Sequence, residues 1–143
     1  MGEGDGEHEG GEEYDPGVAK TQRMLRDPVT YAIIGAAQKV HRTLGPGFAE
    51  STYQRALAKE LADMKVAFAS QPEYEVFYEG AHCGTYRPDM VVAEHVVIEL
   101  KAVSGISGDH IAQTISYMKA SRLPKALLIN FGGRSLEWRR FQN

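Results

Sequence analysis

Two acidic residues and a lysine have a spacing that suits metal-dependent hydrolysis. Asp89 follows Arg87-Pro88, and Glu99 and Lys101 lie ten and twelve residues further on. Residues two apart in a strand point to the same side, so Glu99 and Lys101 share one face. If the two segments are antiparallel neighbours, the carboxylates meet at one end of a hairpin, where their repulsion favours a cation between them. Mg²⁺ or Mn²⁺ is the expected cofactor, because hard cations prefer oxygen ligands. The spacing also fits an ordinary solvated pair of Glu99 and Lys101.

Glu50 is a further candidate metal ligand, on an expected helix. It precedes Tyr53, Leu57 and Leu61 at spacings of three, four and four, which places it at the top of the stripe that faces the core. A buried carboxylate needs a hydrogen-bond network, a charged partner or a metal. The alternative is that Glu50 lies in the first helical turn, where the helix dipole favours a negative charge.

His110, Gln113 and Tyr117 form a polar ridge on another expected helix, at spacings of three and four. Ile111, Ile115 and Met118 form a separate apolar face. The helix should pack through its apolar face and present the ridge beside it. Such a ridge can position a phosphate or an attacking water, or it can be a solvated edge.

Three helices are expected to position these residues. Asp27-Pro28 combines an N-cap residue with proline at the first helical position, and the apolar residues that follow continue to Leu44. Gly45-Pro46-Gly47 ends that helix, and a second follows over residues 48–65, with Met64 also on its apolar stripe. Asp109 is the expected cap of a third helix, which must end before Pro124.

Alternating and apolar runs predict the strands. They cover residues 73–78, 81–86, 89–92, 96–101, 126–129 and 136–141. Glu79-Gly80 suits a tight turn between the first two strands. Ala126 to Ile129 is apolar on both faces, as expected of a strand inside a sheet. The order of elements predicts an α/β sandwich around a mixed sheet.

Composition is typical of one modest domain in 143 residues, with 43% hydrophobic and 24% charged residues. Residues 1–15 hold seven of the 19 acids and no Lys or Arg, which leaves 12 acids against 16 basic residues, about +4, in residues 16–143. We expect residues 1–25 to be a disordered acidic tail and residues 26–143 to be the folded domain.

The single cysteine, Cys83, excludes an internal disulfide and favours a cytoplasmic location. No apolar run is long enough to span a membrane.

The string Gly47-Phe48-Ala49-Glu50-Ser51-Thr52-Tyr53 matches the pattern Gly-x-x-Glu-x-x-Tyr. With YRPDMVV, VIELKAV, HIAQTISYMKA and LLINFG in the same order, the chain resembles the GxxExxY family, a branch of the PD-(D/E)XK nuclease superfamily. The resemblance covers roughly residues 27–142. It implies a three-layer, restriction-endonuclease-type core in which α-helices flank a mixed central β-sheet, with the acidic cluster at one end of a hairpin.

The resemblance also implies roles for the candidate residues in a metal-dependent nuclease. Asp89, Glu99 and Lys101 match the motif acids and lysine, and Glu50 matches an acid on the preceding helix. Gln113 and Tyr117 resemble a Gln-x-x-x-Tyr element of related branches, and the carbonyl of Leu100 is a further metal ligand in similar sites. The candidate contacts with nucleic acid, expected to be DNA, are Arg87, His110 and Tyr53.

Two other functions are compatible with this sequence. A domain of this size has little surface for a long substrate, so the chain could be a non-catalytic nucleic-acid-binding or scaffolding module that keeps the fold, as a homo-oligomer or with a partner protein in a larger complex. The acidic cluster could instead hold a metal with a purely structural role.

Overall fold

The computed structural model describes residues 27–143. Apart from one additional short strand, its elements follow the expected order, with strand ends shifted by a residue or so. They are α2 (Pro28–Leu44), α3 (Glu50–Asp63), β1 (Phe68–Ser70), β2 (Tyr74–Tyr78), β3 (Ala81–Tyr86), β4 (Met90–Val92), β5 (Val96–Lys101), α4 (Gly108–Ser121), β6 (Lys125–Asn130) and β7 (Glu137–Gln142). The expected acidic tail lies outside the described residues.

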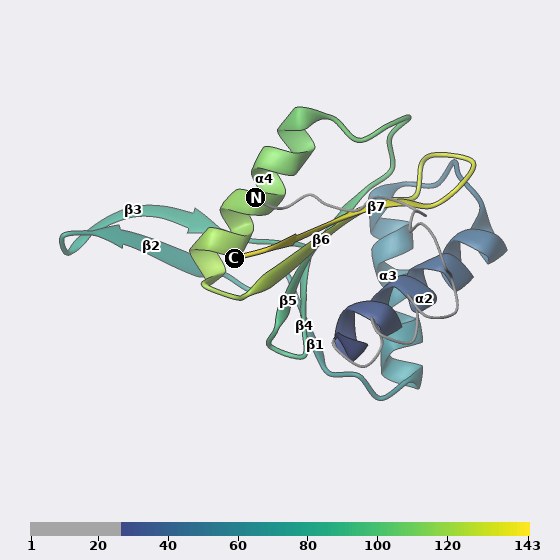
Figure 1. The fold of residues 1–143 in the computed structure, drawn as a ribbon, viewed down its shortest axis with the longest axis horizontal. Coiled ribbons are helices and arrows are strands. Elements are labelled where there is room, and N and C mark those ends of the chain that lie inside the picture. The colour runs from purple at the N-terminus through teal and green to yellow at the C-terminus, as the bar shows by residue number, and fades with distance from the viewer. Residues whose placement is uncertain (1–26) are drawn as a thin grey trace.

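The main sheet has five strands in the order β1-β4-β5-β6-β7. Strands β5 and β6 are parallel and every other pair is antiparallel, so the sheet is mixed. Helices α2 and α3 cover one face of the sheet and α4 covers the other (Figure 1). The predicted three-layer α/β core is therefore confirmed.

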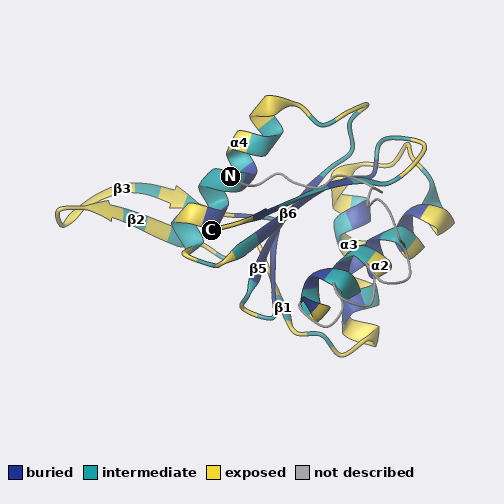
Figure 2. Cartoon of the chain, viewed as in Figure 1, coloured by how far each residue is buried: buried dark blue, intermediate teal, exposed yellow. Residues whose placement is uncertain are grey.

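The two faces of the sheet build two apolar cores. On one face Ile98 and Leu100 of β5 pack with residues of α2 and α3, including Ile33 and Leu57. On the other face Val97 packs with Met118 and other residues of α4. Strands β5 and β6 are almost entirely buried, as expected of strands covered on both sides (Figure 2).

The hairpin of β2 and β3 does not join the main sheet. It forms a separate two-stranded sheet that projects from the body, with only its base near α4 (Figure 1). Phe77 and Tyr78, near its tip, are 61% and 67% exposed. The sequence predicts the hairpin but not its separation, because alternation identifies a strand and not its neighbours. Short strand β1, at the edge of the main sheet, was not predicted at all.

The helix ends agree with the sequence at α2 and differ at α3 and α4. Asp27 caps α2, accepting the N–H of Thr30 at 3.2 Å. Helix α3 is shorter than expected, and Met64, predicted to face the core, lies beyond its end and is 44% exposed. The N-cap of α4 is Ser107 and not Asp109, because the Ser107 hydroxyl accepts the N–H of His110. No helix within residues 27–143 has the length and apolar character needed to cross a membrane.

Candidate active site

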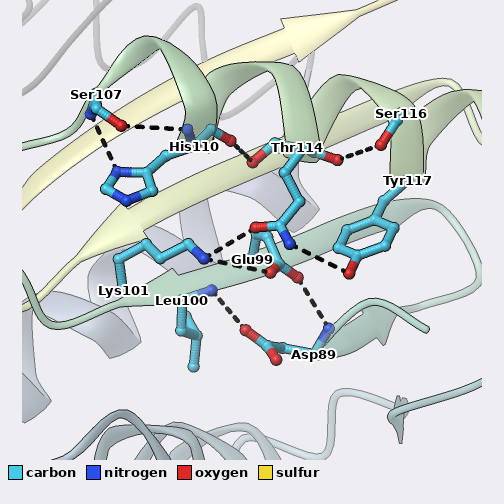
Figure 3. Close-up of polar contacts among 10 residues, drawn as sticks. Asp89, Glu99, Leu100, Lys101, Ser107, His110, Thr114, Ser116 and Tyr117 are labelled. Atoms are coloured by element: carbon cyan, nitrogen blue, oxygen red, sulfur yellow. Dashed lines mark hydrogen bonds and ion pairs between the residues drawn. The ribbon is translucent and has the colours of Figure 1, made fainter. Parts of the chain in front are cut away.

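Asp89 and Glu99 meet at the end of the β4–β5 pair and hold each other in place. The backbone N–H of Asp89 donates to Glu99 Oε1 at 3.1 Å, and the N–H of Leu100 donates to Asp89 Oδ2 at 2.8 Å (Figure 3). The backbone of Asp89 thus holds the Glu99 carboxylate, and the backbone of Leu100 holds the Asp89 carboxylate. Within the described residues, no hydrogen bond reaches Asp89 Oδ1 or Glu99 Oε2.

Strand register explains why the two acids face the same way. Met90 pairs with Ile98 and Val91 with Val97, so continuing the ladder places Asp89 opposite Glu99. Val91 and Val97 pack on the α4 side, and side chains two residues along point to the same side. The acids therefore face the layer of α4. The expected antiparallel arrangement of the two segments is confirmed.

The carbonyl of Leu100 also points toward this end of the β4–β5 pair. In a strand, the N–H and C=O of one residue point the same way, and the Leu100 N–H is directed at Asp89. The next carbonyl, that of Lys101, points the other way and accepts the N–H of Phe131 at 2.8 Å. A backbone oxygen thus lies on the same side of the strand as the acid pair.

The acid pair is poorly solvated. Burial is the main reason that the pKa of Glu99 is raised from 4.5 to about 8, and the charge of Asp89 adds to it. Burial also raises the pKa of Asp89, with a contribution from Glu50, while the Leu100 N–H and Lys101 act in the opposite direction. The Glu99 side chain is only 6% exposed. Two adjoining carboxylates with raised pKa values are a place where a cation would relieve the cost of ionisation.

Lys101 is held beside the acids by a side chain of α4. Its Nζ donates to Gln113 Oε1 at 2.9 Å and lies 4.0 Å from Glu99 Oε2. Gln113 in turn donates to the hydroxyl of Tyr117 at 3.4 Å, and the Tyr117 ring meets Tyr86 edge-on. The pKa of Tyr117 is raised by burial and by the charges of Glu99 and Asp89. Lys101, Gln113 and Tyr117 are therefore brought together with the acid pair.

Glu50 approaches the acids from the opposite layer and does not complete a cluster with them. It begins α3 and is exposed, contrary to the expectation that it faces the core. Its charge helps to raise the pKa of both Asp89 and Glu99. However, no group of three or more His, Cys, Asp or Glu side chains within residues 27–143 is arranged to hold a metal. Two of the three expected carboxylates converge, and the third lies nearby.

The three residues expected to contact nucleic acid have different surroundings. Tyr53 is fully buried, stacked on Phe131 with ring centroids 4.6 Å apart, so the direct contact predicted for it is wrong. His110 is half-buried, and its Nδ1 accepts the N–H of Ser107 at 3.0 Å as part of the α4 cap. Arg87 is exposed and pairs with Glu73.

Two residues that position the site were missed in the sequence. Gln54 of α3 donates to the carbonyl of Asp89 at 2.9 Å and so joins the α3 layer to the acid pair. Asn130, fully buried at the end of β6, bonds to both backbone groups of Val103 and so fixes the chain after Lys101. Gln54 lies one turn after Glu50, which could have indicated that it faces the same way. No local pattern indicates the contact of Asn130, because it depends on the β5–β6 register.

A mixed sheet between helical layers, with two acids and a lysine at the end of an antiparallel strand pair, defines a restriction-endonuclease-like domain. The chain belongs to the PD-(D/E)XK nuclease superfamily, whose family model matches residues 27–141. Nucleases of this superfamily generally use divalent metals and act on nucleic acid. No curated protein and no solved structure matches the chain.

Net charge gives little support to nucleic-acid binding by this domain. Of the 16 basic residues, 13 lie in residues 27–143, against 12 acids, so the domain itself carries only +1. The basic excess noted above comes mainly from three residues just before it: Lys20, Arg23 and Arg26. Any contact with a substrate must therefore depend on local placement of groups rather than on a strongly basic body.

Proposed function

We propose that this protein is a divalent-metal-dependent nuclease that hydrolyses phosphodiester bonds, with DNA as its substrate. The observation that carries the proposal is the pair formed by half-buried Asp89 and buried Glu99, with Lys101 Nζ 4.0 Å from Glu99 Oε2. Each acid has one carboxylate oxygen that accepts no hydrogen bond from residues 27–143. We also propose that the chain belongs to the GxxExxY branch. Its motif residues have physical roles here: Gly47 has φ +116, Glu50 begins α3, and Tyr53 fixes the loop between them.

The site residues fit a hard cation. Asp89 and Glu99 would hold it directly, the Leu100 carbonyl would be a further ligand, and Glu50 would act through water because it is not part of a three-carboxylate group. When bound, Mg²⁺ or Mn²⁺ would neutralise charge on the phosphate and lower the pKa of the attacking water. An all-oxygen set of this kind selects such cations over softer metals.

The remaining residues would orient the reacting groups. Lys101 would direct the attacking water or stabilise negative charge on the phosphate, as a point charge near the acid pair. Gln113 holds Lys101 through its amide oxygen, and Tyr117 receives the amide N–H, so both would fix the position of the ammonium group. Arg87 and His110 are proposed to contact the phosphate backbone, which positions a strand without reading its sequence.

The test is cleavage of single-stranded, double-stranded and branched DNA and of RNA, with Mg²⁺, Mn²⁺ or EDTA. Asp89→Asn, Glu99→Gln and Lys101→Met preserve size and remove charge, and each should abolish or strongly reduce cleavage. Glu94→Gln is the matched control, because Glu94 is an exposed carboxylate in the turn at the far end of the same strand pair. Cleavage that persists in EDTA, or that the three variants retain, would refute the proposal.

A second candidate is a binding or oligomeric module that keeps the fold without turnover. It is favoured by the projecting β2–β3 hairpin with its exposed Phe77 and Tyr78, and by the lack of a three-carboxylate group among the described residues. This function predicts salt-sensitive nucleic-acid binding without metal-dependent cleavage. Size-exclusion chromatography with light scattering distinguishes a monomer from an assembly, and Phe77→Ser should dissociate an assembly that uses the hairpin.

A further inference from the structure

The loop between α2 and α3 is fixed to the core by one buried hydroxyl. Tyr53 donates to the carbonyl of Gly45 at 2.5 Å and accepts the N–H of Phe48 at 3.2 Å. Gly45 and Gly47 have φ of +68 and +116, a region that glycine adopts without strain. Because Tyr53 is fully buried and stacked on Phe131, the loop has one well-defined position.

This loop presents an aromatic side chain to solvent. Phe48 is 49% exposed, and its ring meets Tyr53 edge-on, with centroids 6.2 Å apart and planes at 75°. Phe48 precedes the N-cap of α3 and Tyr53 lies in the first turn, so this contact is of the hydrophobic-staple type. A leucine would serve a staple equally well. The contact leaves half of the aromatic side chain accessible.

Phe48 directly precedes the helix that contacts the acid pair. It comes two residues before Glu50, the first residue of α3. One turn further along α3, Gln54 contacts the Asp89 carbonyl at 2.9 Å. An exposed aromatic group is therefore held at the start of the helix that contacts Asp89.

We propose that Phe48 stacks on an unpaired base of the substrate, beside the phosphate that Asp89 and Glu99 address. Bases stack on aromatic rings without regard to sequence, and this interaction does not require a large net positive charge, which residues 27–143, at +1, do not have. In an intact duplex, neighbouring base pairs cover both faces of each base. The substrate class is therefore a single-stranded, frayed or branched end. This inference rests on the proposed nuclease function.

The hairpin aromatics are weaker candidates for the same role. Phe77 and Tyr78 are more exposed, but they lie near the tip of a hairpin that projects from the body, away from the end of the β4–β5 pair that carries the acids (Figure 1). Phe77 is consequently a matched control: an exposed phenylalanine of the same fold, away from the acid pair.

The experiment pairs a change in the protein with a change in the strand. Binding of short single-stranded DNA is measured by fluorescence anisotropy in Ca²⁺, for wild type, Phe48→Leu, Phe48→Trp and Phe77→Leu. The strands carry an abasic site at each position in turn. Phe48→Leu keeps the staple but lacks an aromatic face, and it should weaken binding roughly 5- to 100-fold, whereas Phe48→Trp and Phe77→Leu should bind as wild type does.

The abasic series distinguishes stacking from a structural effect. Wild type should bind more weakly when the abasic site is at one particular position of the strand. Phe48→Leu should be insensitive to that abasic site, because the substitution and the missing base each remove the same stacking interaction. The slope of affinity against salt should be unchanged, since no phosphate contact is lost. If wild type binds and cleaves, but the affinity losses from Phe48→Leu and from the abasic site add together, stacking is refuted and the nuclease function stands. If wild type neither binds nor cleaves any strand, both proposals fail.

Discussion

The raised pKa of Glu99 predicts that the metal-free protein loses stability as the pH rises. The folded-state pKa is about 8, against 4.5 for an ordinary glutamate. Between these values the folded protein binds one more proton than the unfolded chain, so stability falls by about 1.4 kcal/mol per pH unit. From about pH 6 to about pH 8 the loss is roughly 2 kcal/mol, because Glu99 is half ionised at the upper limit.

The measurement is urea unfolding in EDTA across this pH range, for wild type and Glu99→Gln. The glutamine still accepts the Asp89 N–H but does not ionise, so its stability should depend less on pH by about 2 kcal/mol, or roughly 8 °C in Tm for a domain of this size. Comparing the two proteins removes the contributions of ionisable groups other than Glu99. Glu94→Gln, which changes an exposed carboxylate, should behave as wild type does.

A divalent cation should reverse the trend. A cation held by Asp89 and Glu99 requires both to be ionised, so its binding near neutral pH should release a proton and stabilise the protein more at the higher pH. The reasoning is refuted if wild type and Glu99→Gln show the same pH dependence in EDTA. That result would mean that Glu99 is solvated enough to ionise normally.

Three other substitutions test the contacts around the site. Gln54→Leu removes the bond to the Asp89 carbonyl and should weaken Mn²⁺ binding by about 10-fold, measured by titration calorimetry, as losses around metal ligands typically do. Tyr53→Phe leaves the α2–α3 loop without its buried hydroxyl and should lower the free energy of unfolding by about 1–2 kcal/mol in urea. Lys125→Met leaves the buried carboxylate of Asp27 without its partner at 3.0 Å and should cost about 3 kcal/mol in the same assay, less at low pH where Asp27 is protonated.

The predictable parts of the fold are those determined by residues that are close together in the sequence. Asp27-Pro28 identifies the start of α2 because cap and proline preferences act within one turn. The alternation through Val96 to Lys101 identifies β5 and the shared face of Glu99 and Lys101, because strand geometry has a period of two. The meeting of Asp89 with Glu99 follows from a short turn between two strands, which leaves few alternative registers.

The parts that were not predictable depend on contacts between distant segments. Glu50 lies in the first turn of α3, as the alternative interpretation expected, but helical counting cannot tell how far that turn is covered by other segments, and Glu50 is exposed. The core-facing stripe correctly predicts that Tyr53 is buried, which is incompatible with the nucleic-acid contact also predicted for it. The partners of its hydroxyl, Gly45 and Phe48, lie in an irregular loop that no periodic pattern predicts. The separation of the β2–β3 hairpin from the main sheet depends on which strands pair with one another, and the alternation within a strand does not determine its partners.

In the proposed metal site, the position of Lys101 would leave the acid pair available to a cation. An ammonium group at hydrogen-bonding distance would neutralise Glu99 and lower its pKa, as opposite charges do. Instead Gln113 accepts the Lys101 N–H at 2.9 Å and holds Nζ 4.0 Å from Glu99, so that the pKa of Glu99 stays near 8. The two carboxylates meanwhile cannot separate, because each is bonded to the backbone of the opposite strand. In the proposed mechanism, helix α4 would thus keep the lysine close enough to act on a bound phosphate, yet too far away to occupy the place of the metal.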